Sequence, residues 1–181
     1  MVYVILGVIA LILIYVVAVY NSLVKLRNMV SEAFSTMDVY LKKRWDLIPN
    51  LVEIVKGYAK HESSTLEEVV RLRNLSYDKM SLSDKIDTNE ELSSGISKLF
   101  AIAENYPDLK ASQNFSDLSK ELTKIEDEIA QSRKYYNAVV KKNNTKIEMF
   151  PSNIIAGLFR FKNAKMFEAT TDERATVKVE L

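Results

Sequence analysis

The stretch Asn21–Glu62 reads NSLVKLRNMVSEAFSTMDVYLKKRWDLIPNLVEIVKGYAKHE and carries one apolar stripe over its whole length. Successive members of the stripe are three or four residues apart, which is the α-helical period. They are Leu23, Leu26, Val30, Ala33, Met37, Leu41, Trp45, Ile48, Val52, Val55 and Ala59. Because a single amphipathic helix cannot bury such a stripe alone, the stretch predicts a long helix covered by partner helices from the rest of the chain.

The segment before this helix, Val2–Tyr20, contains no charged and no amide side chain. In a helix it would span about 28 Å, close to the hydrocarbon thickness of a bilayer. A cleaved signal peptide is disfavoured because no Lys or Arg precedes the apolar run and Ala18-Val19-Tyr20 ends in a bulky residue. A buried core helix is the other alternative. We expect a transmembrane helix that contacts the lipid bilayer.

Lys and Arg residues follow the apolar segment, beginning with Lys25 and Arg27. The positive-inside rule therefore places a short N-terminus outside and the C-terminal part in the cytoplasm. We expect a single-pass protein of the cell membrane with three regions. These are a transmembrane anchor (1–21), a cytoplasmic helical bundle (22–150), and a Phe-rich segment with an extended C-terminal tail (151–181).

The composition excludes several classes of function. The 25 basic and 24 acidic side chains nearly cancel, so no global field favours nucleic acid. The absence of cysteine excludes disulfides, thiolate nucleophiles and cysteine-bound metals. Four glycines and three prolines are typical of a helical protein and leave little for hairpins.

Pro49 interrupts the long helix without changing the phase of the stripe, which predicts a kink rather than an end. A break is expected near Glu62–Ser64, since Ser64 and Glu67 have capping-box spacing; alternatively, the helix continues without a break. The apolar pattern then extends to about Asn74 or Met80. The polar segment Ser76–Asn89 predicts a connection with at most a short turn.

A further helix is expected from Asn89 to the residues before Pro107, with Leu92, Ile96, Leu99, Phe100 and Ala103 facing inward. The last long helix, Ser112–Glu148, has a seam with the 3.5-residue mean spacing of a left-handed coiled coil. Its members are Phe115, Leu118, Leu122, Ile125, Ile129, Ser132, Tyr136, Val139 and Asn143. The polar members Ser132 and Asn143 either fix the register or, as we favour, lie where the bundle opens to water.

The pattern predicts an all-α protein in which the transmembrane helix leads into an antiparallel bundle of about four helices, two long and two shorter. For the C-terminal Thr176–Leu181, which alternates like a strand, no pairing partner is evident, and we expect an extended or disordered tail.

Several blocks carry a family resemblance. They are Asp38-Val39 with Leu41-Lys42 and Arg44, DLIPNLVE (46–53), VKGYAKHE (55–62), YPDLKA (106–111) with Asn114-Phe115, and FPSNIIA (150–156). In this order they resemble the LemA family over nearly the whole chain after the anchor. The resemblance implies a bacterial single-pass membrane protein with a cytoplasmic helical bundle. It implies no catalytic residues, because the family has no established catalytic activity.

One candidate interaction surface lies on the long helix. Asp46, Asn50 and Glu53 share one flank and would suit a partner contact or weak metal binding. The interpretation we favour is that they satisfy backbone groups freed at Pro49 and pair with basic residues of a neighbouring helix. The run Lys42-Lys43-Arg44 is typical of a solvated face. His61, the only histidine, is typical of a surface residue and excludes a metal site built on a histidine pair.

The other candidate surface is the stretch Met149–Phe167, which combines Phe, Ile, Leu and Met with basic residues. Its candidate contact residues are Phe150, Phe159, Arg160, Phe161 and Lys162, with Lys165 adding charge. The composition suits an element at the membrane interface or a docking surface for another membrane protein. The alternative, slightly favoured, is a plug that folds over the open end of the bundle.

The sequence therefore predicts a membrane-tethered, non-catalytic interaction or scaffold protein with an unknown protein partner, either another membrane protein or itself. The alternative function is a lipid-sensing or membrane-remodelling module that uses Phe150–Phe167. We predict no catalytic, cofactor-binding or metal-binding residues and no nucleic-acid partner. An enzyme would require a convergent polar pocket, for example around Asp46, Asn50 and Glu53.

Overall fold

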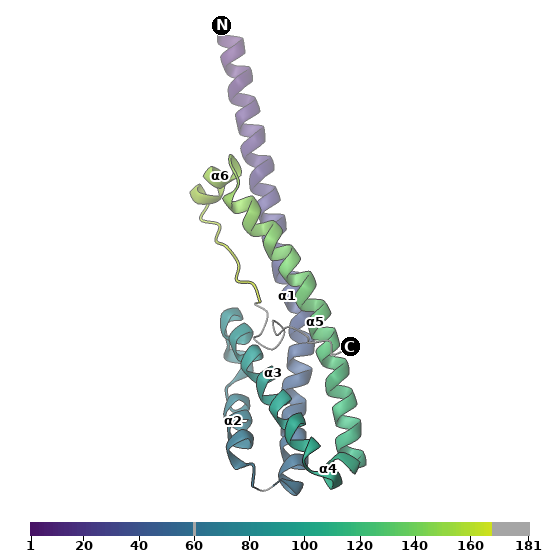
Figure 1. The fold of residues 1–181 in the computed structure, drawn as a ribbon. Helices are drawn as coiled ribbons and strands as arrows, with labels where there is room; N and C mark the ends of the chain where they lie inside the picture. The colour runs from purple at the N-terminus through teal and green to yellow at the C-terminus, as the bar shows by residue number, and fades with distance from the viewer. Residues whose placement is uncertain (60, 168–181) are drawn as a thin grey trace, which may run out of the picture. The chain divides into compact units, whose positions relative to one another are not determined.

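The computed structural model describes residues 1–59 and 61–167, and the regular structure in these residues is helical throughout (Figure 1). The elements are α1 (Val2–Tyr58), α2 (Ser63–Arg73), the 3-10 turn η1 (Tyr77–Lys79), α3 (Leu82–Glu104), α4 (Pro107–Ala111), α5 (Gln113–Glu148) and α6 (Ser152–Leu158). The predicted all-α class with two long and two shorter bundle helices is confirmed. The predicted tail, Thr176–Leu181, lies outside the described residues.

Helix α1 joins the apolar segment and the first bundle helix without interruption. Pro49 lies inside α1 and does not end it, as predicted, and α1 ends at Tyr58, directly after Gly57. The alternative of one helix continuing beyond Glu62 is wrong. The predicted capping box at Ser64 is also wrong: α2 begins at Ser63, with Glu62 as its N-cap residue, so Ser64 already lies within the first turn.

Helix α3 begins at Leu82 and not near Asn89 as the sequence predicted. The physical reason is a capping box. The Ser81 hydroxyl accepts a bond from the Asp84 backbone N–H at 3.2 Å, and the Asp84 carboxylate accepts one from the Ser81 N–H at 3.1 Å. The first turns of α3 bury few side chains, so their sequence lacks an apolar period. At the other end, Pro107 lies beyond the end of α3 and starts α4.

The chain divides into two compact units, each with a segment of both α1 and α5. The apolar-helix unit contains Met1–Met37 and Ser132–Met166, and the bundle unit contains Asp38–Gln131 together with Phe167. This grouping combines parts of the predicted anchor, bundle and Phe-rich regions. Their boundaries at residues 21 and 150 remain a prediction.

The bundle unit packs the C-terminal part of α1, the N-terminal part of α5, and α2 and α3 around one apolar core. Helices α2 and α3 run antiparallel, since Glu68 pairs with Lys98 and a shared cavity places Leu75 near Thr88. The core contains the predicted stripe and seam. Leu41, Trp45, Ile48 and Val55 of α1, and Ala59 directly after it, are buried with Leu66, Val69, Leu92, Leu99, Leu122 and Ile129, whereas Val52 and Phe100 are half-buried.

In the apolar-helix unit the chain after α6 returns along α5. The side-chain amide of Asn144 exchanges two hydrogen bonds of 2.9 Å with the backbone of Ala164, and the Tyr136 hydroxyl donates to the Lys165 carbonyl at 2.8 Å. Asn143 beside them is buried, and its amide donates to the Asn144 side chain. The expectation that the bundle opens to water at Asn143 is therefore wrong; Ser132 is half-buried.

The close approach of α2 and α3 at Gly95 gives a prediction. A Cβ at Gly95 would lie 2.9 Å from Val69 Cγ2, and Val69 is fully buried with a stiff branched side chain. Overpacking costs about 1–3 kcal/mol and exceeds the gain of up to about 1 kcal/mol in helix propensity. We expect Gly95→Ala to lower the free energy of unfolding by about 1 kcal/mol, measured by denaturation of the detergent-solubilised protein followed by circular dichroism.

Gly57 is the matched control, because a Cβ there meets nothing within 4 Å. Gly57→Ala should raise the free energy of unfolding by a few tenths to about 1 kcal/mol. Equal stabilisation by both substitutions would show that α2 and α3 are not in close contact at Gly95.

Candidate functional site

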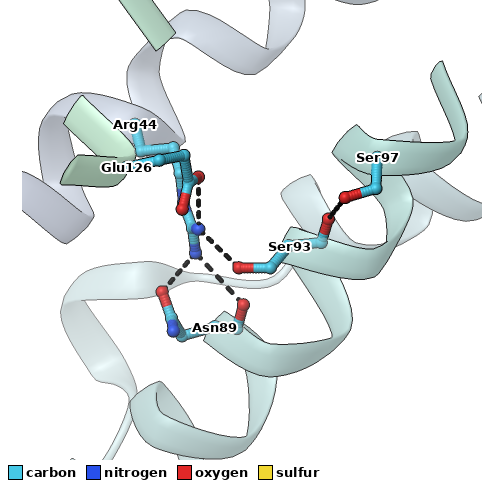
Figure 2. Close-up of polar contacts among 5 residues, drawn as sticks. All are labelled: Arg44, Asn89, Ser93, Ser97 and Glu126. Carbon is cyan, nitrogen blue, oxygen red and sulfur yellow. Dashed lines mark hydrogen bonds and ion pairs between the residues drawn. The ribbon is translucent and has the colours of Figure 1, made fainter. Parts of the chain in front are cut away.

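Arg44 is the centre of a buried polar network in the bundle unit (Figure 2). Its side chain is 1% exposed, and its guanidinium donates to three neighbours. Nη1 donates to Glu126 Oε1 and to Ser93 Oγ, both at 2.7 Å. Nη2 donates to the Asn89 carbonyl at 3.1 Å and to the Asn89 side-chain oxygen. One residue of α1 thus holds α3 and α5 by charge-assisted bonds.

The expectation of a solvated basic run is wrong for Arg44. Lys43 is exposed. Lys42 is half-buried and pairs with Asp46. Arg44 lies three residues after Leu41 and four before Ile48, so it is on the buried stripe itself. Leu51, which the predicted stripe also omitted, is fully buried on the same line. The helical spacing was the available signal for both residues.

A second cluster joins α1 to the turn η1 and to α3. The Tyr77 hydroxyl donates to Asp38 Oδ1 at 2.6 Å, and Lys85 Nζ lies 2.9 Å from Asp38 Oδ2 and 4.4 Å from the centre of the Tyr77 ring. The Trp45 ring lies 5.2 Å from the Tyr77 ring. Burial, the bond to Asp38 and the negative charge of Asp38 raise the pKa of Tyr77 far above its ordinary value. The hydroxyl therefore stays a donor that fixes Asp38.

Tyr136 provides a test by pH. Burial raises its pKa from 10.0 to about 12. Between these values the unfolded chain releases a proton that the folded protein keeps, so stability falls as the pH rises through this range, by at most about 1.4 kcal/mol per pH unit for each such tyrosine. We expect the free energy of unfolding to fall less steeply between pH 10 and 12 in Tyr136→Phe than in the unmodified protein, measured by denaturation at each pH. A slope in Tyr136→Phe equal to that of the unmodified protein would contradict the assignment.

The candidate surface at Asp46, Asn50 and Glu53 is an exposed face of α1. Asp46 was expected to pair with a basic residue of a neighbouring helix. It pairs instead with Lys42 of its own helix. Glu53 borders an open cavity of about 330 Å³ that is lined by Ile48, Pro49, Val52, Val70 and Arg73. Its wall is mostly apolar, and Asp46 and Asn50 are not among its lining residues. The geometry suits a contact surface better than a convergent catalytic pocket.

Within the Phe-rich segment, Ser152–Leu158 form α6, which packs on α1 in the apolar-helix unit (Figure 1). Ile155 and Ala156 are buried against Val19 and Leu23, with Val16, Ile147 and Phe161 at the edge of this cluster. The Tyr20 ring lies 4.7 Å from the Phe159 ring and 5.8 Å from the Phe161 ring, and the Arg27 guanidinium lies 5.5 Å from the centre of the Phe161 ring. The segment is therefore attached to the end of the apolar run.

The other side of this segment is exposed and apolar. Phe150 is 77% exposed and Leu158 73%, and Met149, Ile154 and Phe159 are also exposed. Arg160 and Lys162 are exposed beside them, and Arg160 has a positive φ of 57° where the chain turns after α6. Of the predicted contact residues, Phe159 and Phe161 meet at Tyr20, whereas Phe150, Arg160 and Lys162 face solvent.

The described residues contain no group of three or more His, Asp and Glu side chains placed to hold a metal ion. His61 is exposed, in a turn between α1 and α2. Among the described helices, α1 has a stretch long and apolar enough to cross a membrane, and only 6% of that stretch is buried.

These features define a class: an all-helical protein with an exposed, apolar N-terminal helix of the kind that associates with membranes. The model of the LemA family matches residues 33–181, and the chain belongs to the LemA family. The resemblance found in the sequence is thereby confirmed.

The chain is also similar to individual proteins, one of which carries the family's name. Protein LemA of Metamycoplasma hominis is 29% identical over 161 residues, which cover 87% of this chain and 72% of the relative. Magnetosome proteins MamQ 1 and MamQ 2 of Paramagnetospirillum magneticum are each 24% identical in an alignment of 175 positions that covers 82% of this chain. The match spans 64% of the length of these two proteins.

Proposed function

We propose that this protein is a membrane-tethered, non-catalytic interaction protein. In this proposal α1 crosses the cell membrane with its N-terminus outside, and the helical bundle presents its faces to a protein partner in the cytoplasm. The observation that carries the proposal is the continuity of α1, which runs from an exposed apolar stretch into the bundle without a break.

The alternatives for the apolar stretch fit less well. A core helix would be buried, whereas Val2–Tyr15 is exposed along its whole length. A signal sequence would be removed, whereas Val19 lies in the cluster that holds α6 on α1. Removing it would expose Ile155 and Ala156, so the packing supports retention of the segment.

Photocrosslinking in cells tests the interaction role. Photoreactive residues would replace Glu53 on α1 and Phe159 next to α6, with exposed Lys124 on α5 as the control position. We expect a dominant adduct to one protein from Glu53 or Phe159 and not from Lys124. The absence of a protein adduct at both positions would overturn the interaction role.

A second candidate function is a lipid-sensing or membrane-remodelling module formed by Phe150–Phe167. It is favoured by the exposed apolar side of α6, which is attached at the end of the apolar run of α1. Exposed aromatic and aliphatic side chains flanked by basic residues are typical of elements in the lipid headgroup layer.

The cysteine-free chain allows a direct test of this second function. A polarity-sensitive fluorophore at Leu158→Cys in the full-length protein in nanodiscs should report an apolar environment, and one at the exposed Lys124→Cys should report water. Making Arg160, Lys162 and Lys165 acidic should shift the Leu158 label towards water. An aqueous signal at Leu158 in the unmodified sequence would exclude this function.

A further inference from the structure

An apolar groove lies between α1 and α5 in the apolar-helix unit. It has a volume of about 510 Å³ and an almost entirely apolar wall. Its lining residues are Leu26 of α1, one face of α5 formed by Ala138, Lys141, Lys142, Thr145 and Lys146, and Met149 directly after α5. The three lysines line the groove with their methylene stems, and a charged amino group ends each stem. A chain of methylenes next to an anionic group would match both features.

The groove lies close to the end of the apolar run. Leu26 follows Tyr20 by six residues, or about 9 Å along a helix. The headgroup layer of a bilayer is about 5–8 Å thick on each side of the hydrocarbon core. If α1 crosses the membrane, the groove therefore lies where the headgroup layer meets the water on the side of the bundle. This position is within about one screening length of the lipid phosphates.

The charge of this part of the molecule has the sign that an anionic ligand requires. The apolar-helix unit contains ten basic residues and two acidic residues, a net charge of +8. The basic residues are Lys25, Arg27, Arg133, Lys134, Lys141, Lys142, Lys146, Arg160, Lys162 and Lys165, and the acidic ones are Glu32 and Glu148. Residues 38–131 contain 13 basic and 18 acidic residues. The apolar-helix unit is therefore positive and residues 38–131 are negative, although the whole chain is nearly neutral.

The two acidic residues do not neutralise the groove. The Glu148 carboxylate accepts a hydrogen bond of 2.6 Å from the Asn163 amide, and neither Glu148 nor Glu32 is among the lining residues. Lys141 and Lys142 are exposed and Lys146 is half-buried, and their spacing places all three on one face of α5.

We propose that this groove binds an anionic phospholipid of the cytoplasmic leaflet. An acyl chain lies along Leu26 and Met149, and the phosphate is held by Lys141, Lys142 and Lys146. The proposal rests on the membrane tethering proposed above and adds the class of lipid and the residues that select it. Each lysine near a charged leaflet adds to the affinity, so the preference for anionic over zwitterionic lipid is expected to be on the order of tenfold.

The test uses the full-length protein in nanodiscs, with a fluorophore on Thr145→Cys as the single labelled site. The probes are brominated phosphatidylglycerol and brominated phosphatidylcholine, each present at the same low fraction in unbrominated phosphatidylcholine. We expect phosphatidylglycerol to quench the label at about one tenth of the fraction that phosphatidylcholine requires. Lys141→Gln, Lys142→Gln and Lys146→Gln together should abolish this difference.

The matched control is a triple variant with Lys120, Lys124 and Lys134 of α5 replaced by Gln, which removes the same charge outside the groove. It should keep the preference. Equal quenching by both lipids in the unmodified groove, or loss of the preference in the control, would overturn the proposal. Failure of the protein to enter nanodiscs would instead overturn the tethering, so the two failures are distinguishable. Inorganic phosphate should not displace the lipid; displacement would assign the lysines to a soluble anion.

Discussion

Replacing Arg44 with methionine is expected to lower the free energy of unfolding of the bundle by about 2–4 kcal/mol. Methionine keeps most of the apolar stem but removes every donor, so Glu126, Ser93 and Asn89 lose the charged group that they share. Removing one partner of a buried ion pair costs about 3–5 kcal/mol. We expect a loss towards the lower end of this range, because Glu126 is 33% exposed and water can hydrate part of its charge.

The measurement is urea denaturation of the detergent-solubilised full-length protein, followed by circular dichroism. Arg71→Met is the matched control, because Arg71 is an exposed arginine on α2, and its replacement should change stability by less than about 0.5 kcal/mol. Adding Glu126→Gln to Arg44→Met should recover part of the loss, since it removes the uncompensated carboxylate. Equal stability of Arg44→Met and the unmodified protein would show that the network does not hold the helices together.

Introducing Lys at both Ile9 and Leu13 is expected to release the protein from the membrane. Each charge near the middle of a spanning helix costs about 2.5–3.5 kcal/mol of insertion free energy, so two together cost about 5–7 kcal/mol. Both side chains are exposed, and neither belongs to the cluster that holds α6. The substitutions should therefore act on insertion and leave the packing of the bundle unchanged.

Fractionation of cells, with carbonate extraction of the membranes, measures this effect. Asn28→Lys with Glu32→Lys places two lysines at the same spacing on an exposed part of α1 beyond the apolar run, and this variant should stay in the membrane pellet. If the Ile9 and Leu13 variant also resists carbonate, the apolar stretch is not the anchor, and the proposed tethering is wrong.

The sequence was sufficient where local periodicity decides structure. The stripe of α1 and the seam of α5 repeat at the helical period over many turns, so nearly every member could be assigned to the core, and the family blocks agreed with the family model. The start of α3 at Leu82 was not predicted, because the capping box that begins this helix has an unusual residue. Asp84 stands where a capping box usually has Glu or Gln.

The candidate sites could be predicted only in part. The attachment of Phe159 and Phe161 to Tyr20 depends on how α6 turns back on α1, a contact between segments far apart in sequence. The lysine groove was not predicted at all, because Leu26 and Met149 become neighbours only when α1 and α5 pack.

By itself the sequence determined the helical class, the apolar N-terminal helix, the two long helices and the family, because these depend on residue type and on spacing along one helix. Only the tertiary structure decided that Arg44 is buried and that the basic residues gather beside the apolar run. Burial and electrostatic potential depend on which segments meet in space. The same arginine would be solvated if Glu126, Ser93 and Asn89 did not meet around it.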